Sequence, residues 1–508
     1  MSEKKQLAVN MVTNIFYIAI NYIITFLLTS YIVKNISGEA YGFIGLCNNL
    51  INYATLVTVA LNSVAGRFIT VEVHRGNNRK ANEYFSSTLA ANIVLSVLIL
   101  LIVIPLALKI ESIFNVPVEL ISDVQKLFLL TAINLIISVI STVFTVSTFI
   151  TNKLYLSSIA NLCGIIVRAL LLLMLFSVFT PSIVFVGIAT VSSTLVIWLI
   201  NVYYTKKLTP ILKLRKLDVS FSATKELFSS GIWSSVTKLS QILSDGMDLL
   251  FSNLWLGAYV MGQLSIAYTL PTFVAQFLSM IINLFSPKLT ENYAKDNLKK
   301  VVEDIQLNMK LTGFFGNVIF FGVVCMGKAF FKLWVPTADI NLVYCLSVIA
   351  CGSVLVSSVC SPLSNVFLMA NKLKLNSLVW FGAGIFDAVA VVLLINGTGL
   401  GVYAVAGVSK AVSIIIYLTF WPIYTSRCLK ISSIEFYKII GRYFFVCIVM
   451  GAVMGVTKFA LWNCSGWGDF FIQVLILTGI GMAVNFLIFL NKGERYNILG
   501  MIRRKVFK

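Results

Sequence analysis

Six ionisable side chains lie inside apolar stretches of this 508-residue chain that are long enough to cross a membrane. They are Lys238, Asp245, Asp248, Arg168, Asp387 and Lys410. A charge at the centre of a bilayer costs at least about 2.5–3.5 kcal/mol on insertion scales, so each is a candidate functional group. Counted by helical rise, the three cations and Asp387 fall near mid-depth, and the other two aspartates lie toward the outer face. Such cations could hold an anion, and Asp245 or Asp248 could hold a coupling cation.

Uncharged polar groups follow these charges at helical spacing. From residue 234 to residue 252, six polar side chains recur at intervals of 4, 3, 4, 3 and 4, which places them on one helical face. They are Ser234, Lys238, Gln241, Asp245, Asp248 and Ser252. A similar stripe in the first span includes Asn21, and one in the second includes Asn48 and Asn52. Amides and hydroxyls in this pattern suit a wet, sugar-compatible cavity, and hydrogen bonding between packed helices is the alternative.

The composition requires that membrane-spanning helices position these groups. The chain is 58% hydrophobic and 12% charged, against roughly 25% charged in globular proteins. We predict an all-α polytopic membrane protein with about 14 transmembrane helices, because fourteen apolar runs of about 23 residues can be marked off. The predicted spans are 11–33, 40–65, 86–108, 124–149, 155–178, 182–204, 228–251, 257–285, 309–331, 340–369, 377–396, 398–421, 439–462 and 467–490. The connections leave no room for a soluble catalytic domain, so no enzyme is expected.

The basic residues predict the orientation of these spans. With the N-terminus inside, 28 lysines and arginines face the cytoplasm and three face out, namely Lys34, Lys109 and Lys332. Basic loops favour the cytoplasmic side, so both termini should be cytoplasmic. The net charge of +19 is therefore an orientation signal and does not indicate nucleic-acid binding. The only histidine, His74, lies in a loop, and no metal site or cofactor is expected.

An internal repeat predicts how the spans are organised. Segments 152–158 and 371–377 are identical at five of seven positions, at a spacing of 219 residues that also separates Arg168 from Asp387. Six spans separate the segments, which predicts two parallel-repeat six-helix lobes plus two C-terminal helices. We expect an N-terminal lobe at 1–204, a cytoplasmic inter-lobe loop at 205–227, a C-terminal lobe at 228–421, and extra spans with a basic tail at 422–508. Arg168 and Asp387 could form an ion pair between the lobes, or Arg168 could bind substrate.

Several of these features together resemble one transporter family. They are the six-plus-six repeat, the basic inter-lobe loop, the two added spans and the lack of a nucleotide-binding motif, with the first span and its loop to Tyr41-Gly42, Gly66-Arg67-Phe68 and the N-K-L-x-L-x-S turns. The chain resembles the polysaccharide (O-antigen type) flippase branch of the multidrug/oligosaccharidyl-lipid/polysaccharide exporter superfamily. The resemblance covers nearly the whole sequence.

The resemblance implies a function in the assembly of surface polysaccharide such as lipopolysaccharide O-antigen. Such a protein moves undecaprenyl-pyrophosphate-linked oligosaccharide repeat units from the cytoplasmic to the outer face of the bacterial inner membrane by alternating access. Its partners would be this substrate, membrane lipids and other polysaccharide-assembly proteins. The anionic head would lie near Lys238, Arg168 and Lys410.

Two other functions were weighed against a flippase. A cation-coupled multidrug or small-solute exporter of the same superfamily typically carries an acidic residue in the first span, and residues 11–33 are uncharged. A membrane glycosyltransferase or polymerase would need an acidic pair or a large loop outside, and the longest outer loop, 109–123, holds only three acidic residues.

Overall fold

The computed structural model describes residues 3–214, 216–243, 247–370, 372–491, 493 and 495. Within these residues the protein is all-α and has no strand. Twelve helices are long and apolar enough to cross a membrane, and α2 (Gly38–His74), which bends by 63°, is a thirteenth. The protein is therefore a multi-pass membrane protein.

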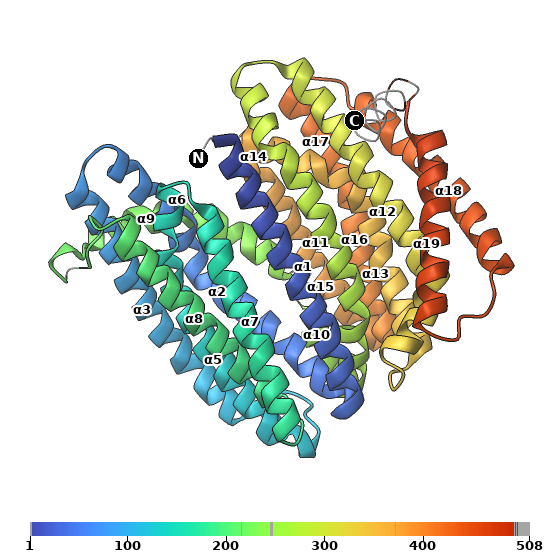
Figure 1. The fold of residues 1–508 in the computed structure, drawn as a ribbon, viewed down its shortest axis with the longest axis horizontal. Helices are drawn as coiled ribbons and strands as arrows, with labels where there is room; N and C mark the ends of the chain where they lie inside the picture. The colour runs from blue at the N-terminus through green and yellow to red at the C-terminus, as the bar shows by residue number, and fades with distance from the viewer. Residues whose placement is uncertain are drawn as a thin grey trace. The chain divides into compact units, whose positions relative to one another are not determined.

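The chain forms two compact units. Unit 1 comprises Met1–Ser265 with Trp380–Ala388, and unit 2 comprises Ile266–Val379 with Val389–Lys508. Long helices lie side by side within each unit (Figure 1). The lobe boundaries near residues 204 and 228 stay a prediction, because proximity rather than the repeat defines these units.

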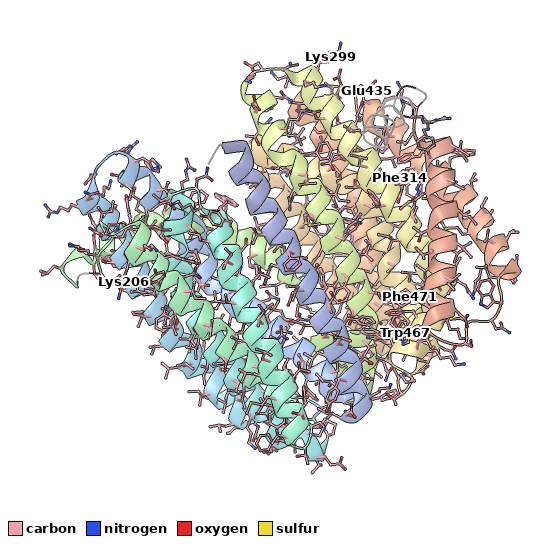
Figure 2. All side chains as sticks on the ribbon, viewed as in Figure 1. Lys206, Lys299, Phe314, Glu435, Trp467 and Phe471 are labelled. Carbon is pink, nitrogen blue, oxygen red and sulfur yellow. The ribbon has the colours of Figure 1, made fainter. Side chains whose placement is uncertain are left out.

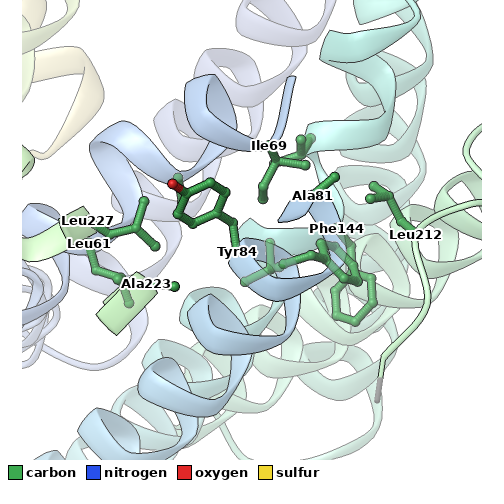
Figure 3. Close-up of a cluster of buried hydrophobic side chains, with 12 residues drawn as sticks. Leu61, Ile69, Ala81, Tyr84, Phe144, Leu212, Ala223 and Leu227 are labelled. Atoms are coloured by element: carbon green, nitrogen blue, oxygen red, sulfur yellow. The ribbon is translucent and has the colours of Figure 1, made fainter. Parts of the chain in front are cut away.

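Unit 1 holds the first half of the helices. They are α1 (Glu3–Asn35), α2, α3 (Asn78–Leu108), α4 (Ile110–Ile113), η1 (Val118–Leu120), α5 (Ile121–Phe144), α6 (Val146–Ile150), α7 (Leu154–Val178), α8 (Val184–Leu208), η2 (Lys216–Asp218), α9 (Phe221–Gln241), α10 (Asp248–Phe251) and the π-helical η4 (Ser252–Leu256). Its buried cluster joins Leu61 of α2, Tyr84 of α3, Phe144 of α5 and Leu227 of α9 (Figure 3). Burial of these apolar side chains fixes the inner ends of the four helices relative to one another.

Unit 2 holds most of the second half. Helix α11 (Ala258–Ala294) begins in unit 1, and α15 (Leu373–Gly397) contains the segment 380–388 that belongs there. The other elements are α12 (Leu298–Trp334), α13 (Ile340–Cys360), η5 (Ser361–Leu363), α14 (Ser364–Met369), α16 (Val402–Leu418), α17 (Phe420–Leu429), α18 (Ile434–Ala460), α19 (Trp467–Val484) and the π-helical η6 (Asn485–Phe489). Figure 2 places Lys299 and Glu435 at the opposite end of unit 2 from Trp467 and Phe471.

Helix boundaries recur at the spacing of the sequence repeat. Helices α2 and α11 begin and end 220 residues apart, and α7 and α15 begin and end 219 apart. The turns after α2 and α11 also correspond: Gly76 and Asp296 have positive φ, and Asn77 and Asn297 each accept a hydrogen bond from the backbone N–H three residues on. An asparagine cap at the same position in both halves makes the same turn, so the repeat is a repeat of helix ends as well as of residues.

The predicted inter-lobe loop 205–227 is attached to α3 rather than extended. Asn82 donates to the carbonyl of Ile211 at 3.1 Å and accepts from the N–H of Lys213 at 2.7 Å. Glu226 accepts a hydrogen bond from the Tyr84 hydroxyl at 2.8 Å. These contacts fix the path of the chain into α9.

The seventh predicted span, 228–251, requires a correction. One regular helix does not extend through it: α9 ends at Gln241, π-helical turns follow at residues 242 and 243, and α10 begins at Asp248. This segment is also absent from the helices that are apolar enough to span on hydropathy. The other thirteen predicted spans coincide with the helices that meet that criterion.

The last two spans are joined to unit 2 by polar contacts. Asn317 of α12 and Asn485 exchange side-chain hydrogen bonds at 3.0 and 2.7 Å. Lys458 of α18, for which the sequence suggested contact with lipid headgroups, donates to Gln473 of α19 at 2.9 Å. A lysine inside a helix pair is thus satisfied by a neighbouring amide.

Candidate functional site

The candidate site begins where α9 crosses α2. Gly231 of α9 lies directly on the backbone of Ala60, because a Cβ at this position would come within 1.7 Å of the Ala60 carbonyl oxygen. One turn further, the Ser235 hydroxyl donates to the Leu56 carbonyl at 3.2 Å. Only glycine allows so close a crossing, and this brings the following turns of α9 against the middle of α2.

The bend of α2 lies at the same level. Its two straight parts are Gly38–Leu56 and Thr58–His74. The Thr55 hydroxyl donates to the Asn52 carbonyl at 2.7 Å, and the Thr58 hydroxyl donates to the Thr55 carbonyl at 3.1 Å. Hydroxyls that bond back to helix carbonyls favour bending. The bend exposes the Leu56 carbonyl to Ser235, which supplies a hydrogen-bond donor from α9.

Lys238 and Asn52 meet at this crossing. The Lys238 ammonium lies 3.4 Å from the Asn52 side-chain oxygen, and among the described residues it forms no ion pair. Asn52 is exposed, as are Asn48 one turn away on α2 and Gln241 one turn away on α9. Exposed amides beside an ammonium, far from the helix ends, require water rather than lipid. Four of the sequence-predicted site residues therefore lie together.

Arg168 lies on a second seam of unit 1, between α7 and α1. Its charge interacts with Tyr17 of α1, and Asn21, half-buried, lies one turn further along α1. The Arg168 Nε is buried and has no hydrogen-bond partner among the described residues. A buried guanidinium N–H without an acceptor is costly, so it would favour an incoming anion.

Lys410 is the one described site residue that belongs to unit 2. Its ammonium lies 5.2 Å from the centre of the Tyr268 ring, and both side chains are half-buried. A cation over an aromatic face is stabilised by the ring electrons. Sequence analysis missed Tyr268, because residues 142 positions apart give no local signal of contact.

The acidic candidates are placed differently from one another. Asp387 and Asp248 are each 2% exposed, the first in the 380–388 segment of α15 and the second at the start of α10. Asp248 interacts electrostatically with Tyr53 of α2. Asp245 lies outside the described residues. The pairing of Arg168 with Asp387 stays a prediction.

The polar stripe from residue 234 to residue 252 is not one continuous face. The interruption after Gln241 separates its two ends, and Ser252 is fully buried with no hydrogen-bond partner for its hydroxyl among the described residues. The prediction that Ser252 faces water is therefore wrong. The spacing rule assumed a regular helix, and the π-helical turns change the direction of every later side chain.

A catalytic metal centre would need clustered ligands. In the described part of the chain, no three His, Cys, Asp or Glu side chains are grouped so that they could hold a metal ion. The chemistry open to this site is thus that of binding: a cation for an anion, and amides for hydroxyl groups.

Sequence comparison relates the chain to polysaccharide assembly. Residues 32–335 match the family described as polysaccharide biosynthesis protein. The uncharacterized membrane protein EpsK of Bacillus subtilis (strain 168) is 29% identical over 506 residues, which cover 98% of each chain.

Structure comparison relates the fold to transporters. An inward-facing multidrug resistance MATE family transporter of the MOP superfamily gives a TM-score of 0.70 at 13% identity, covering 83% of this chain and 99% of that one. The lipid II flippase MurJ in an inward closed conformation gives 0.63 at 15% identity, covering 99% and 100%. At these identities the likeness shows the fold alone. The MATE chain leaves unmatched a length similar to the predicted addition at 422–508.

Proposed function

Because the chain belongs to the polysaccharide biosynthesis protein family, we propose that it is an alternating-access flippase for undecaprenyl-pyrophosphate-linked oligosaccharide repeat units. The substrate enters at the cytoplasmic face of the inner membrane and leaves at the outer face for surface polysaccharide synthesis. The lobes at 1–204 and 228–421 rock about the loop 205–227, and spans 13 and 14 form the addition at 422–508.

The Lys238–Asn52 contact is the observation that carries this proposal. A mid-span ammonium with no ion pair among the described residues can accept a pyrophosphate, and the exposed amides of Asn48, Asn52 and Gln241 can bond sugar hydroxyls. Arg168 adds a buried donor without an acceptor in unit 1, and Lys410 adds a cation in unit 2. Asp387 offsets part of this positive charge, and Asp248 or Asp245 remains a possible ion-coupling group.

A transport assay in proteoliposomes tests the proposal. We expect Lys238→Gln to slow translocation of a lipid-linked oligosaccharide at least about tenfold, since a charge-assisted contact to phosphate is worth about 1.5–3 kcal/mol. Lys225→Gln is the matched control, because Lys225 is an exposed lysine of the same helix, four turns away. Equal rates for the Lys238 variant and the unmodified protein would reject this site, and no translocation by the unmodified protein would reject the function.

A further inference from the structure

Unit 1 contains a polar cavity away from the α2–α9 crossing. Its volume is about 470 Å³, and it lies among the later half of α2, the ends of α5 and α6, and the start of α7. That size falls within the range of ligand pockets. Ala65, Ile69, Val143 and Val146 line it and also belong to the buried cluster of Figure 3, which gives the cavity an apolar, well-packed floor.

Acceptor oxygens dominate the polar part of the lining. The polar lining includes Asn62, Thr88, Thr142, Thr145, Thr148 and Ser157. The four threonine hydroxyls each donate to a carbonyl of their own helix segment, at 2.7 to 2.9 Å. Their donors are therefore used, and the lone pairs that remain can accept hydrogen bonds from a ligand. A ligand rich in hydroxyl groups matches such a wall.

The wall is held in place by an amide pair. Asn62 and Asn92 exchange side-chain hydrogen bonds at 3.1 and 3.0 Å, and Asn92, fully buried, also donates to the Val139 carbonyl at 3.1 Å. This network joins α2, α3 and α5 behind the cavity. Because the network is satisfied without a ligand, the cavity does not need to close to be stable.

One end of the cavity carries positive charge without a carboxylate. Arg67 lines it, is exposed, and has no ion pair or hydrogen bond to any described residue. No acidic side chain is among the lining residues. Leu154 and Ser157, from the first turn of α7, also line it, and no side chain caps that turn. The positive end of this helix adds to the attraction that Arg67 exerts on an anion.

The second half of the repeat argues that these groups are not simply part of the fold. The positions equivalent to Asn62, Arg67 and Thr148, at spacings of 220 and 219, are Ile282, Pro287 and Phe367. The same helix ends are therefore built with apolar residues there. Packing of these helices does not require the polar set.

We propose that this cavity binds a polyol phosphate, with Arg67 on the phosphate and the threonine oxygens on the hydroxyl groups. The sugar-phosphate part of the lipid-linked substrate and the headgroup of a glycerophospholipid both have this chemistry. In the first case the cavity receives the substrate at the predicted cytoplasmic side, and this reading rests on the proposed function.

Binding of glucose 1-phosphate to the purified full-length protein in phosphatidylcholine nanodiscs tests the proposal. We expect saturable binding by calorimetry, weakened about tenfold or more in Arg67→Gln. Arg79→Gln is the control: Arg79 is an exposed arginine of the next loop that does not line the cavity, and its loss should leave binding unchanged. Thr148→Val keeps the side-chain shape and should remove the preference for glucose 1-phosphate over inorganic phosphate.

The outcomes separate the sources and the two proposals. Competition by phosphatidylglycerol that disappears in Arg67→Gln identifies the lipid headgroup as occupant, and no competition identifies the sugar end. Equal binding by the Arg67 variant and the unmodified protein, with unchanged melting temperature, overturns the site. Binding of glucose 1-phosphate by a protein that does not translocate lipid-linked oligosaccharide would keep the site and reject the flippase.

Discussion

At the scale of single residues, Gly231 determines whether the α2–α9 crossing exists. A side chain there would meet the Ala60 carbonyl, which is a rigid backbone atom and cannot rotate away. The contacts of Ser235 with Leu56 and of Lys238 with Asn52 lie one and two turns beyond it. They depend on the helix separation that glycine sets, so the position of Lys238 is a consequence of a residue without a side chain.

Substitution of Gly231 should therefore damage both stability and site. We expect Gly231→Ala to destabilise the protein by about 1–3 kcal/mol through overpacking, although alanine is the better helix former. The thermal midpoint in detergent should fall. Gly441→Ala is the control, because Gly441 is exposed in α18 and a Cβ there meets nothing within 4 Å. An unchanged midpoint for Gly231→Ala would show that the helices are further apart than the structure has them.

At the scale of elements, the segment after α9 carries the site on an irregular helix. The regular part ends at Gln241, and Ser252 lies in the π-helical η4, where Asn253 and Asn115 exchange three hydrogen bonds between backbone and side chain. Gln241 is exposed and Ser252 is fully buried. The irregular turns thus separate a wet part of the segment from a packed one.

Cysteine accessibility distinguishes these two parts. In a cysteine-free background, a cysteine at Gln241 should react with a membrane-impermeant polar thiol reagent, and one at Ser252 should not. The physical reason is water access, since a thiolate forms and reacts only where the reagent and solvent reach it. Modification of both positions at equal rates would contradict the packed placement of Ser252, and reaction at neither would contradict a water-filled space beside α9.

The sequence predicted most helices and only part of the site. Apolar runs and the asparagine-capped turns are local signals, so thirteen of the spans and the equivalence of α2 with α11 followed from them. The interruption near residue 242 did not, because spacing arguments assume an unbroken helix. Ring contacts such as Lys410 with Tyr268 join distant residues and leave no pattern in the sequence.

At the scale of the whole molecule, the repeat has kept helix ends and changed charges. Arg67, Arg168 and Lys238 correspond at 220, 219 and −220 residues to Pro287, Asp387 and Ile18. The halves therefore share a scaffold, and their polar groups differ. The ionisable groups placed near mid-depth by sequence, Lys238, Arg168 and Lys410 against Asp387, leave an excess of positive charge.

That excess determines how voltage should act on the cycle. A pyrophosphate head that leaves a negative interior gains about 2.3 kcal/mol per charge per 100 mV if it moves unaccompanied. Positive groups that hold it neutralise part of this gain, but they also offset the cost of taking the head out of water. An empty carrier that returns with net positive charge at its site again moves favourably, so both half-cycles can be downhill without a co-ion.

We therefore expect translocation of a lipid-linked oligosaccharide in proteoliposomes to be faster when the acceptor side is positive and to continue without a sodium gradient. Removal of charge in Lys410→Gln should weaken binding of the pyrophosphate-linked substrate more than that of an uncharged analogue, because only the former loses an ionic contact. Lys332→Gln, at the predicted outer end of α12, is the control. Strict dependence on an imposed ion gradient would instead assign the driving force to a coupled cation, with Asp248 or Asp245 as its ligand, and equal loss for both analogues would make Lys410 a structural residue.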